Sequence, residues 1–201
     1  AFGLNKRVLA YFACDLYNVY MTTQLNGAET VFLPFNQGSN GAGKDGGAGN
    51  PTTEDGKYVT SYFWENVLQK DKLLDILQKF ISYERSEKKK IMPDGSTKTT
   101  VSSKVIFPRY HQLDVVRKLV SHVRENGAGH NYLIQHSAGS GKSNSIAWTA
   151  YRMASLHDEN NNPIFDSVII VTDRRVLDQQ LQATVSGFDH TLGSVVTIDE
   201  K

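Results

Sequence analysis

The first part of the chain carries three short segments whose composition favours β-strands. Residues 7–12 are mainly apolar and aromatic, and residues 17–23 and 30–33 are rich in β-forming side chains. Asn26 and Gly27 stand between the last two segments, and this pair is a strong signal for a hairpin turn. The pattern predicts three antiparallel strands here, with Cys14 buried at the end of the first.

The next eighty residues change character twice. Residues 37–56 are so rich in glycine that they have little to bury, which predicts a long loop without helix or strand. Residues 61–68 then favour a short helix. A second helix is expected to start at a cap on Asp71 and to bury an amphipathic stripe of apolar side chains: Leu73, Leu74, Leu77, Phe80 and Ile81.

Two polar segments with β-forming side chains follow, at residues 84–92 and 97–106. They flank the turn residues 93–96 (Pro-Asp-Gly-Ser), so a solvated hairpin is predicted. One arm contains three consecutive lysines, Lys88, Lys89 and Lys90. Such a run could contact the phosphates of a nucleic acid, although a run of charges on a projecting hairpin more often only faces solvent.

Helices and strands are expected to alternate after residue 107. An amphipathic helix is predicted from Tyr110 to Val123, and residues 132–134 form an apolar run. A helix to about residue 156, a strand at 167–171 and a helix from about 174 to 183 complete the pattern. Alternation of this kind is typical of a parallel sheet covered by helices, so the second half is interpreted as the start of a doubly wound α/β domain.

The turn after the first of these strands carries the clearest chemistry. Residues 136–143 read His-Ser-Ala-Gly-Ser-Gly-Lys-Ser and open the next helix, which is the context of a phosphate-binding loop. Backbone N–H groups of such a loop and the helix N-terminus attract phosphate. The predicted nucleotide-binding residues are therefore Ser137, Ala138, Gly139, Ser140, Gly141, Lys142 and Ser143, with Lys142 at the β- and γ-phosphates and Ser143 on Mg²⁺.

One position of this loop departs from the usual pattern, which begins with glycine, because this chain has His136 there. The alternative interpretation is an ordinary turn rich in glycine and serine. The strand before it and the helix after it favour the nucleotide site.

Composition and charge exclude several classes of protein, but they do not identify a binding partner. The chain has 201 residues and a formal net charge of +1, too small to argue for nucleic acid by itself. No apolar run approaches the roughly 20 residues that a membrane span needs. With one cysteine, Cys14, an internal disulfide framework and a cysteine-based zinc site are excluded. A reducing, intracellular compartment is therefore expected.

Two further segments resemble elements of superfamily 2 helicases. Arg109-Tyr110-His111-Gln112 precedes the phosphate loop, where those helicases place an aromatic residue and a glutamine that bind adenine. The resemblance implies that Arg109, Tyr110 and Gln112 bind nucleotide. It also implies that Arg174 and Arg175, after the strand at 167–171, contact a DNA backbone. Taken alone, the glutamine is an ordinary polar helix residue and the arginines an ordinary surface pair.

In combination, these motifs resemble the motor (restriction) subunit of type I restriction-modification enzymes. Residues 21–25 and 30–38 are similar to the segment that joins the nuclease domain of that family to its first helicase lobe. The resemblance implies a bacterial or archaeal cytoplasmic protein that hydrolyses ATP with Mg²⁺, translocates double-stranded DNA and cleaves it at distant positions. Its partners would be a methyltransferase (modification) subunit and a specificity subunit, with no membrane involved.

The resemblance also predicts the organisation of the chain. Residues 1–58 would be the end of a nuclease-like domain with the Gly-rich loop, 59–106 a helical linker with the β-hairpin, and 107–201 the start of a RecA-like lobe. The expected fold class is therefore α/β, with an antiparallel β piece first and a parallel-sheet piece second. The nuclease motif, the Asp-Glu-Ala-His motif and the second lobe have no match in these 201 residues, so a fragment of a larger protein is expected, inactive alone.

Two rival interpretations stay open from the sequence. In the first, the chain is a self-contained nucleotide-binding module, its β half binds a partner, and Asp199 and Glu200 at the end of a strand complete the magnesium site. In the second, it binds DNA without nucleotide, which the near-neutral charge disfavours.

Overall fold

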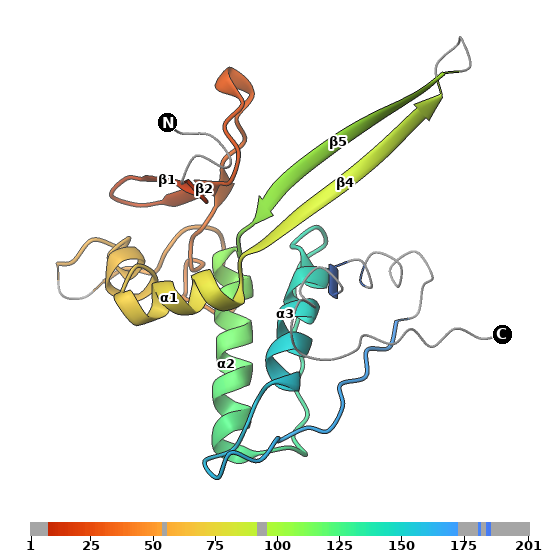
Figure 1. Cartoon of the computed structure of the whole chain (residues 1–201). Coiled ribbons are helices and arrows are strands. Elements are labelled where there is room, and N and C mark those ends of the chain that lie inside the picture. The colour runs from red at the N-terminus through yellow and green to blue at the C-terminus, as the bar shows by residue number, and fades with distance from the viewer. Residues whose placement is uncertain (1–7, 54–55, 92–95, 173–180, 182–183, 186–201) are drawn as a thin grey trace. The chain divides into compact units, whose positions relative to one another are not determined.

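The computed structural model describes residues 8–53, 56–91, 96–172, 181 and 184–185. The chain divides into two compact units, each described below by itself. The first combines Ala1–Asn40 with Gly46–Pro108, and the second combines Gly41–Asp45 with Arg109–Lys201 (Figure 1). Antiparallel strands in the first part are followed by helices, so the predicted mixed α/β class is confirmed.

Three antiparallel strands form the small sheet of the first unit, as predicted. They are β1 (Tyr11–Cys14), β2 (Val19–Thr22) and β3 (Leu33–Pro34), in the order β1-β2-β3. No two-residue turn forms at Asn26, because the chain makes a short 3₁₀ turn, η1 (Gly27–Glu29), before it returns to β3. Cys14 is exposed, and the prediction of a buried thiol was wrong: it is the last residue of β1, an edge strand that pairs with β2 on one side only.

An aromatic cluster forms the core next to this sheet. The ring of Phe12 lies 5.4 Å from that of Phe35, 4.8 Å from Phe63 and 5.6 Å from Phe107, measured between centroids. Phe35 is fully buried, and the hydroxyl of buried Tyr62 donates to its carbonyl at 2.7 Å. The contacts of Phe12 with Phe35 and Phe107 are edge to face, and such contacts add about 0.5–1.5 kcal/mol each to the gain from burial.

The described residues of the Gly-rich segment contain neither helix nor strand, as predicted, and its two ends are held together. Asn36 Oδ1 accepts from Val19 N at 2.8 Å and from Asn50 Nδ2 at 3.0 Å. Gly38 N donates to Gly49 O at 2.8 Å. The tip, residues 41–45, belongs to the second unit, where Lys118 Nζ donates to Ala42 O at 3.0 Å.

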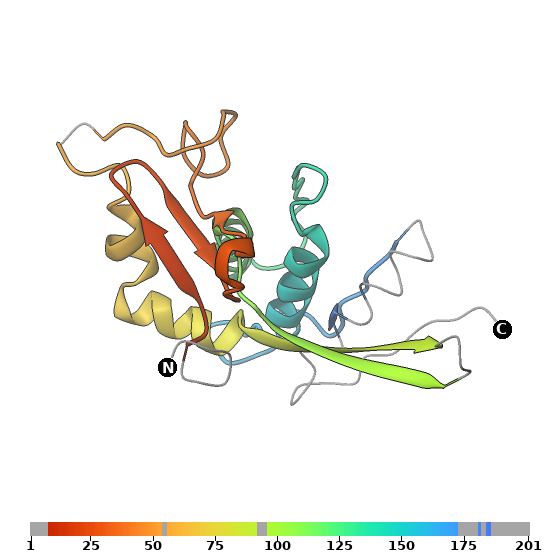
Figure 2. The same ribbon diagram turned by 90° about the horizontal axis from the view of Figure 1, so that it is seen from above.

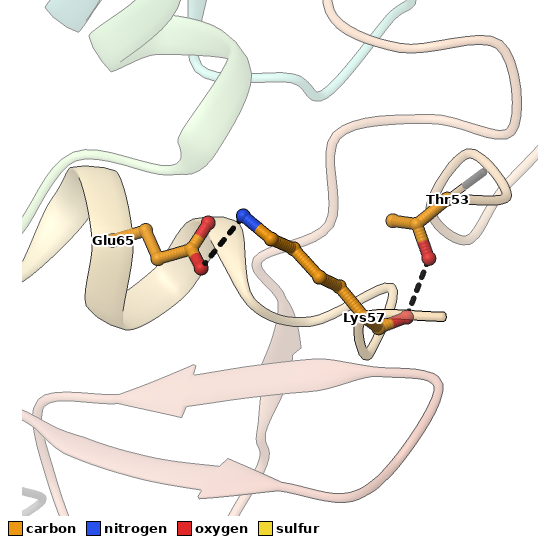
Figure 3. A network of polar contacts seen from close by, with 3 residues as sticks. All are labelled: Thr53, Lys57 and Glu65. Atoms are coloured by element: carbon orange, nitrogen blue, oxygen red, sulfur yellow. Dashed lines mark hydrogen bonds and ion pairs between the residues drawn. The ribbon is translucent and has the colours of Figure 1, made fainter. Parts of the chain in front are cut away.

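Two helical elements follow in the first unit: η2, a π-helical turn (Phe63–Val67), and α1 (Lys70–Lys79). Figure 3 shows the polar contacts that fix the approach to η2: Lys57 Nζ pairs with Glu65 Oε1 at 3.3 Å, and the hydroxyl of Thr53 donates to the Lys57 carbonyl. Asp71 is not the cap of α1, because the helix already begins after Gln69 and Asp71 lies in its first turn.

The predicted hairpin is confirmed and is the longest β element of the described residues. Strands β4 (Ser82–Ile91) and β5 (Thr97–Ile106) pair antiparallel at ten positions, from Ser82 opposite Ile106 to Ile91 opposite Thr97. In both views the hairpin extends away from the rest of its unit (Figures 1 and 2).

Two helices, packed side by side, dominate the second unit: α2 (Tyr110–Asn126) and α3 (Lys142–Ala154). The predicted stripe of α2 is buried, and Trp148 of α3 is fully buried. Gly127 ends α2 with a left-handed φ of 73° and donates to Val123 O at 2.8 Å, a conformation that glycine adopts without strain.

The strands predicted at residues 132–134 and 167–171 do not form paired strands in the described part of the second unit. Leu133 is 93% and Val171 87% exposed. A strand of a parallel sheet is stable when neighbours pair with both its edges and helices cover its faces. These segments lack such neighbours among the described residues, which is the physical reason for the difference.

The helix predicted from about residue 174 and the strand ending in Asp199 and Glu200 lie outside the described residues. Among the helices that are described, none combines the length and the apolar character needed to cross a membrane.

A phosphate-loop candidate at the start of helix α3

The loop before α3 curls tightly at two glycines. Gly139 and Gly141 both have positive φ, 72° and 82°, and Ser140 N donates to Ser137 O at 3.3 Å. Helix α3 begins at Lys142, directly after Gly141, so Lys142 and Ser143 form its first turn. The first N–H groups of a helix have no carbonyl partner within it and carry partial positive charge, which suits an anion.

Lys142 is folded back over this loop. Its Nζ donates to Ser137 O at 2.8 Å and to His136 O at 3.2 Å. The side chain is exposed, so the ammonium group can exchange these two carbonyls for phosphate oxygens without first leaving a buried position. Lys142 therefore lies where its ammonium group can meet an anion bound at this loop.

Gln112 connects helix α2 to the same loop. The residue is only 3% exposed, and its Nε2 donates to Gly141 O at 2.8 Å and to Ser140 O at 3.3 Å. Its Oε1 accepts from Arg109 N at 2.8 Å, within the first turn of α2. Gln112 is therefore not a polar residue on an exposed helix face, since its amide bonds to Gly141, which lies 29 residues further along the sequence.

The approach of Gln112 to the loop leaves little room for a side chain at residue 141. A Cβ atom built at residue 141 would lie 2.5 Å from Gln112 Nε2, which is shorter than real Cβ contacts. The positive φ of Gly141 is a second reason, because L residues with a side chain rarely adopt it. Gly139 has the same backbone preference without any atom near its missing side chain.

Two histidines complete the contact between α2 and the loop. His111 Nε2 donates to Ser140 O at 3.0 Å, and the rings of His111 and His136 meet edge to face with centroids 4.8 Å apart. Burial lowers the pKa of His111, and the neighbouring His136 and Arg109 lower it further, against the opposing effect of the bond to Ser140. Burial and the charge of Lys142 lower the pKa of His136.

One hydroxyl in this loop is buried without a hydrogen-bond partner within the described residues. It is Ser140 Oγ, and the residue is 7% exposed. Buried polar atoms normally have a partner, so an atom of this kind marks a place where a ligand or a water can bind. With the curled backbone, the helix start and the cation of Lys142, this makes the residues present suitable for a phosphate group.

The sequence prediction and the structure can be compared residue by residue. The loop residues Ser137, Ala138 and Gly139 are exposed at the start of α3, and Arg109 and Tyr110 lie at the start of α2, beside Gln112. Arg174 and Arg175 lie outside the described residues. Sequence reasoning gave no role to His111, although its contact with Ser140 O places it in the site. No periodic pattern reveals a contact over such a distance in sequence.

Comparison with known protein families gives a match for this part of the chain. Residues 111–199 match the SWI2/SNF2 ATPase family, a little less than half of the chain. Searches among curated proteins and among solved structures gave no match. The matched segment contains the loop, α3 and all of α2 except its first residue. Residues 111–199 therefore form a helicase-superfamily ATPase region.

Proposed function

We propose that this chain is part of the ATP-dependent, DNA-translocating and DNA-cleaving subunit of a type I restriction enzyme. The main support for ATP binding is the curled loop at the start of α3, with Lys142 folded over it. The narrower assignment, to restriction rather than to another helicase-like ATPase, is supported by the motif combination and by the likeness of residues 21–38 to the linker of that family.

In this proposal the loop binds the phosphates of ATP. Backbone N–H groups of Ala138 to Gly141 surround phosphate oxygens, and Lys142 stabilises the charge that develops on the transferring phosphoryl group. The hydroxyl of Ser143 holds Mg²⁺, which neutralises charge on the β- and γ-phosphates when bound. Lys142 reaches the phosphates by releasing Ser137 O and His136 O.

Tyr110 and Gln112 select adenine, and Gln112 must change a partner to do so. Both N–H groups of its amide donate to carbonyls, so a pair of hydrogen bonds with adenine requires the release of one. The bond to Ser140 O is the longer, and His111 Nε2 also donates to that oxygen. Ser140 O therefore keeps a donor when Gln112 turns away, and His111 acts as a positioning residue.

Calorimetry with a non-hydrolysable ATP analogue and Mg²⁺ tests the nucleotide site. We expect weak binding by the chain, at least tenfold weaker in Lys142→Ala because a phosphate contact is lost. Lys70→Ala is the matched control, since Lys70 is also the first residue of a helix, α1. Equal binding by wild type and Lys142→Ala would overturn the site, and so would no binding by wild type at millimolar analogue. Tight binding of the ATP analogue by this chain without any other subunit would favour the self-contained module.

The restriction assignment needs a separate experiment. The chain is mixed with the methyltransferase and specificity subunits of a type I enzyme from the same source, and co-elution in size-exclusion chromatography is measured. We expect a complex that also retains double-stranded DNA. Failure to co-elute, with the ATP analogue still bound, would remove the restriction assignment and leave a helicase-like ATPase region of another kind.

A further inference from the structure

The β4–β5 hairpin has the dimensions of an arm rather than of a core element. Ten paired positions at about 3.4 Å each give a ribbon about 34 Å long. Both faces of β5 are open to solvent from Thr97 to Ser102, and shielding begins only near its end, with Val105 buried. A ribbon with so little buried surface contributes little to the stability of its unit.

Charge is distributed unevenly along this ribbon. Near the base, Glu84 lies opposite Lys104, and the two side chains form an ion pair of 3.1 Å. In the outer half the register pairs Glu87 with Val101, Lys88 with Thr100, Lys89 with Thr99 and Lys90 with Lys98.

The outer half is also more basic than the chain as a whole. Residues 87–91 and 97–101 contain four lysines and one glutamate, a formal charge of +3, whereas the whole chain carries +1. The connecting segment adds one carboxylate, Asp94. Like charges at directly opposed positions, as at Lys90 and Lys98, destabilise a ribbon unless an anion lies near them. The outer half therefore favours a polyanionic partner.

We propose that the outer half of the β4–β5 hairpin binds the phosphate backbone of double-stranded DNA. Lysine and threonine are both common donors to phosphate oxygens, and the register places Lys88 opposite Thr100 and Lys89 opposite Thr99. The major groove of B-DNA, about 12 Å wide, admits a two-stranded ribbon. The choice of duplex DNA rests on the proposed function, whereas the choice of a polyanion rests on the hairpin alone.

The test compares two triple variants of the full chain that lose the same charge. Lys88→Gln/Lys89→Gln/Lys90→Gln removes the basic run, and Lys70→Gln/Lys72→Gln/Lys79→Gln removes three exposed lysines of α1. Fluorescence anisotropy with a labelled duplex of random sequence measures the affinity from 50 to 200 mM salt. We expect the hairpin triple to bind at least tenfold more weakly at low salt, with the slope of log K against log salt smaller by about 2 to 3. The α1 triple keeps the wild-type slope.

Other outcomes separate this inference from its rivals. Equal weakening by the two triples, or competition by polyglutamate as effective as by duplex, would overturn it. Lys98→Gln, on the opposite strand, is a second variant in case the triple perturbs the hairpin, and it should lower the slope by about 1. Calorimetry with the ATP analogue on the hairpin triple keeps the two proposals apart. If the hairpin triple loses duplex binding but still binds the ATP analogue, the result supports the hairpin as a DNA-binding arm. If the wild-type chain binds duplex DNA but not the ATP analogue, only the proposed function is overturned.

Discussion

The two units of this chain differ in whether their predicted strands find partners among the described residues. In the first, β1 and β3 pair with β2 on either side, and Val19 and Met21 of β2 are 0% and 3% exposed. In the second, Leu133 and Val171 stand almost fully in solvent. Antiparallel strands close through short connections, whereas parallel strands depend on partners far away in the sequence. The strands of the first sheet therefore find their partners among nearby described residues, whereas residues 132–134 and 167–171 do not.

The largest expected effect is on the core of the first unit. Phe35→Ala should cost about 3–5 kcal/mol in the free energy of unfolding, because it leaves a cavity among the neighbouring rings. Leu133→Ala should cost less than about 0.5 kcal/mol, since little apolar surface is lost to solvent. Urea denaturation followed by circular dichroism measures both.

The same pair of variants tests whether residues 132–134 are exposed in solution. A cost for Leu133→Ala close to that for Phe35→Ala would mean that residues 132–134 are buried in solution, for example in a sheet formed between copies of the chain. Repeating the titration at several protein concentrations separates that case, because association makes stability depend on concentration.

Sequence reasoning was most successful where the determining interactions are local. The hairpin at residues 82–106 and the helix α2 follow from turn residues and from a 3.6-residue period, and both were predicted within a few positions. The loop before α3 was found because its chemistry requires glycine at fixed offsets. The bond from Gln112 to Gly141 O and the role of His111 depend on the packing of α2 against α3, which no local pattern contains.

The next prediction concerns two glycines of the phosphate-loop candidate. Gly141→Ala combines a strained φ with a clash against Gln112 Nε2, so it should cost about 2–3 kcal/mol. Gly139→Ala is the matched control, with a similar φ and no atom within 4 Å, and should cost about 1–2 kcal/mol. Equal costs in urea denaturation would contradict the close approach of Gln112.

Replacing an amide side chain in each unit should lower the free energy of unfolding by less than replacing Phe35. Gln112, which joins α2 to the loop, and Asn36, which joins β2 to the Gly-rich segment, each take part in three side-chain hydrogen bonds. Either change to alanine should cost about 1–3 kcal/mol because partners lose a bond. Only Gln112→Ala should also reduce the preference for an ATP over a GTP analogue in calorimetry. A changed preference in Asn36→Ala would contradict the assignment of adenine selection to Gln112.

The smallest expected effect is a dependence on pH confined to the second unit. All six histidines of the chain lie after residue 108. In the folded state the pKa values of His111 and His136 lie below the ordinary 6.5, so below pH 6.5 the unfolded chain binds more protons than the folded one. The contribution of these two histidines to the free energy of unfolding is fully present above pH 6.5, and it is lost as the pH falls from 6.5 through their two lowered pKa values.

Tryptophan fluorescence can assign this loss to one unit, because each unit contains one of the two tryptophans. In a Trp64→Phe background the signal comes from Trp148, which is fully buried in α3. Its unfolding midpoint should fall between pH 7 and pH 5, and less so in His111→Gln/His136→Gln, where the shifted groups are gone. An unchanged pH dependence in the double variant would mean that other groups titrate in this range. The contact between α2 and the loop would then not be the place where protonation opposes folding.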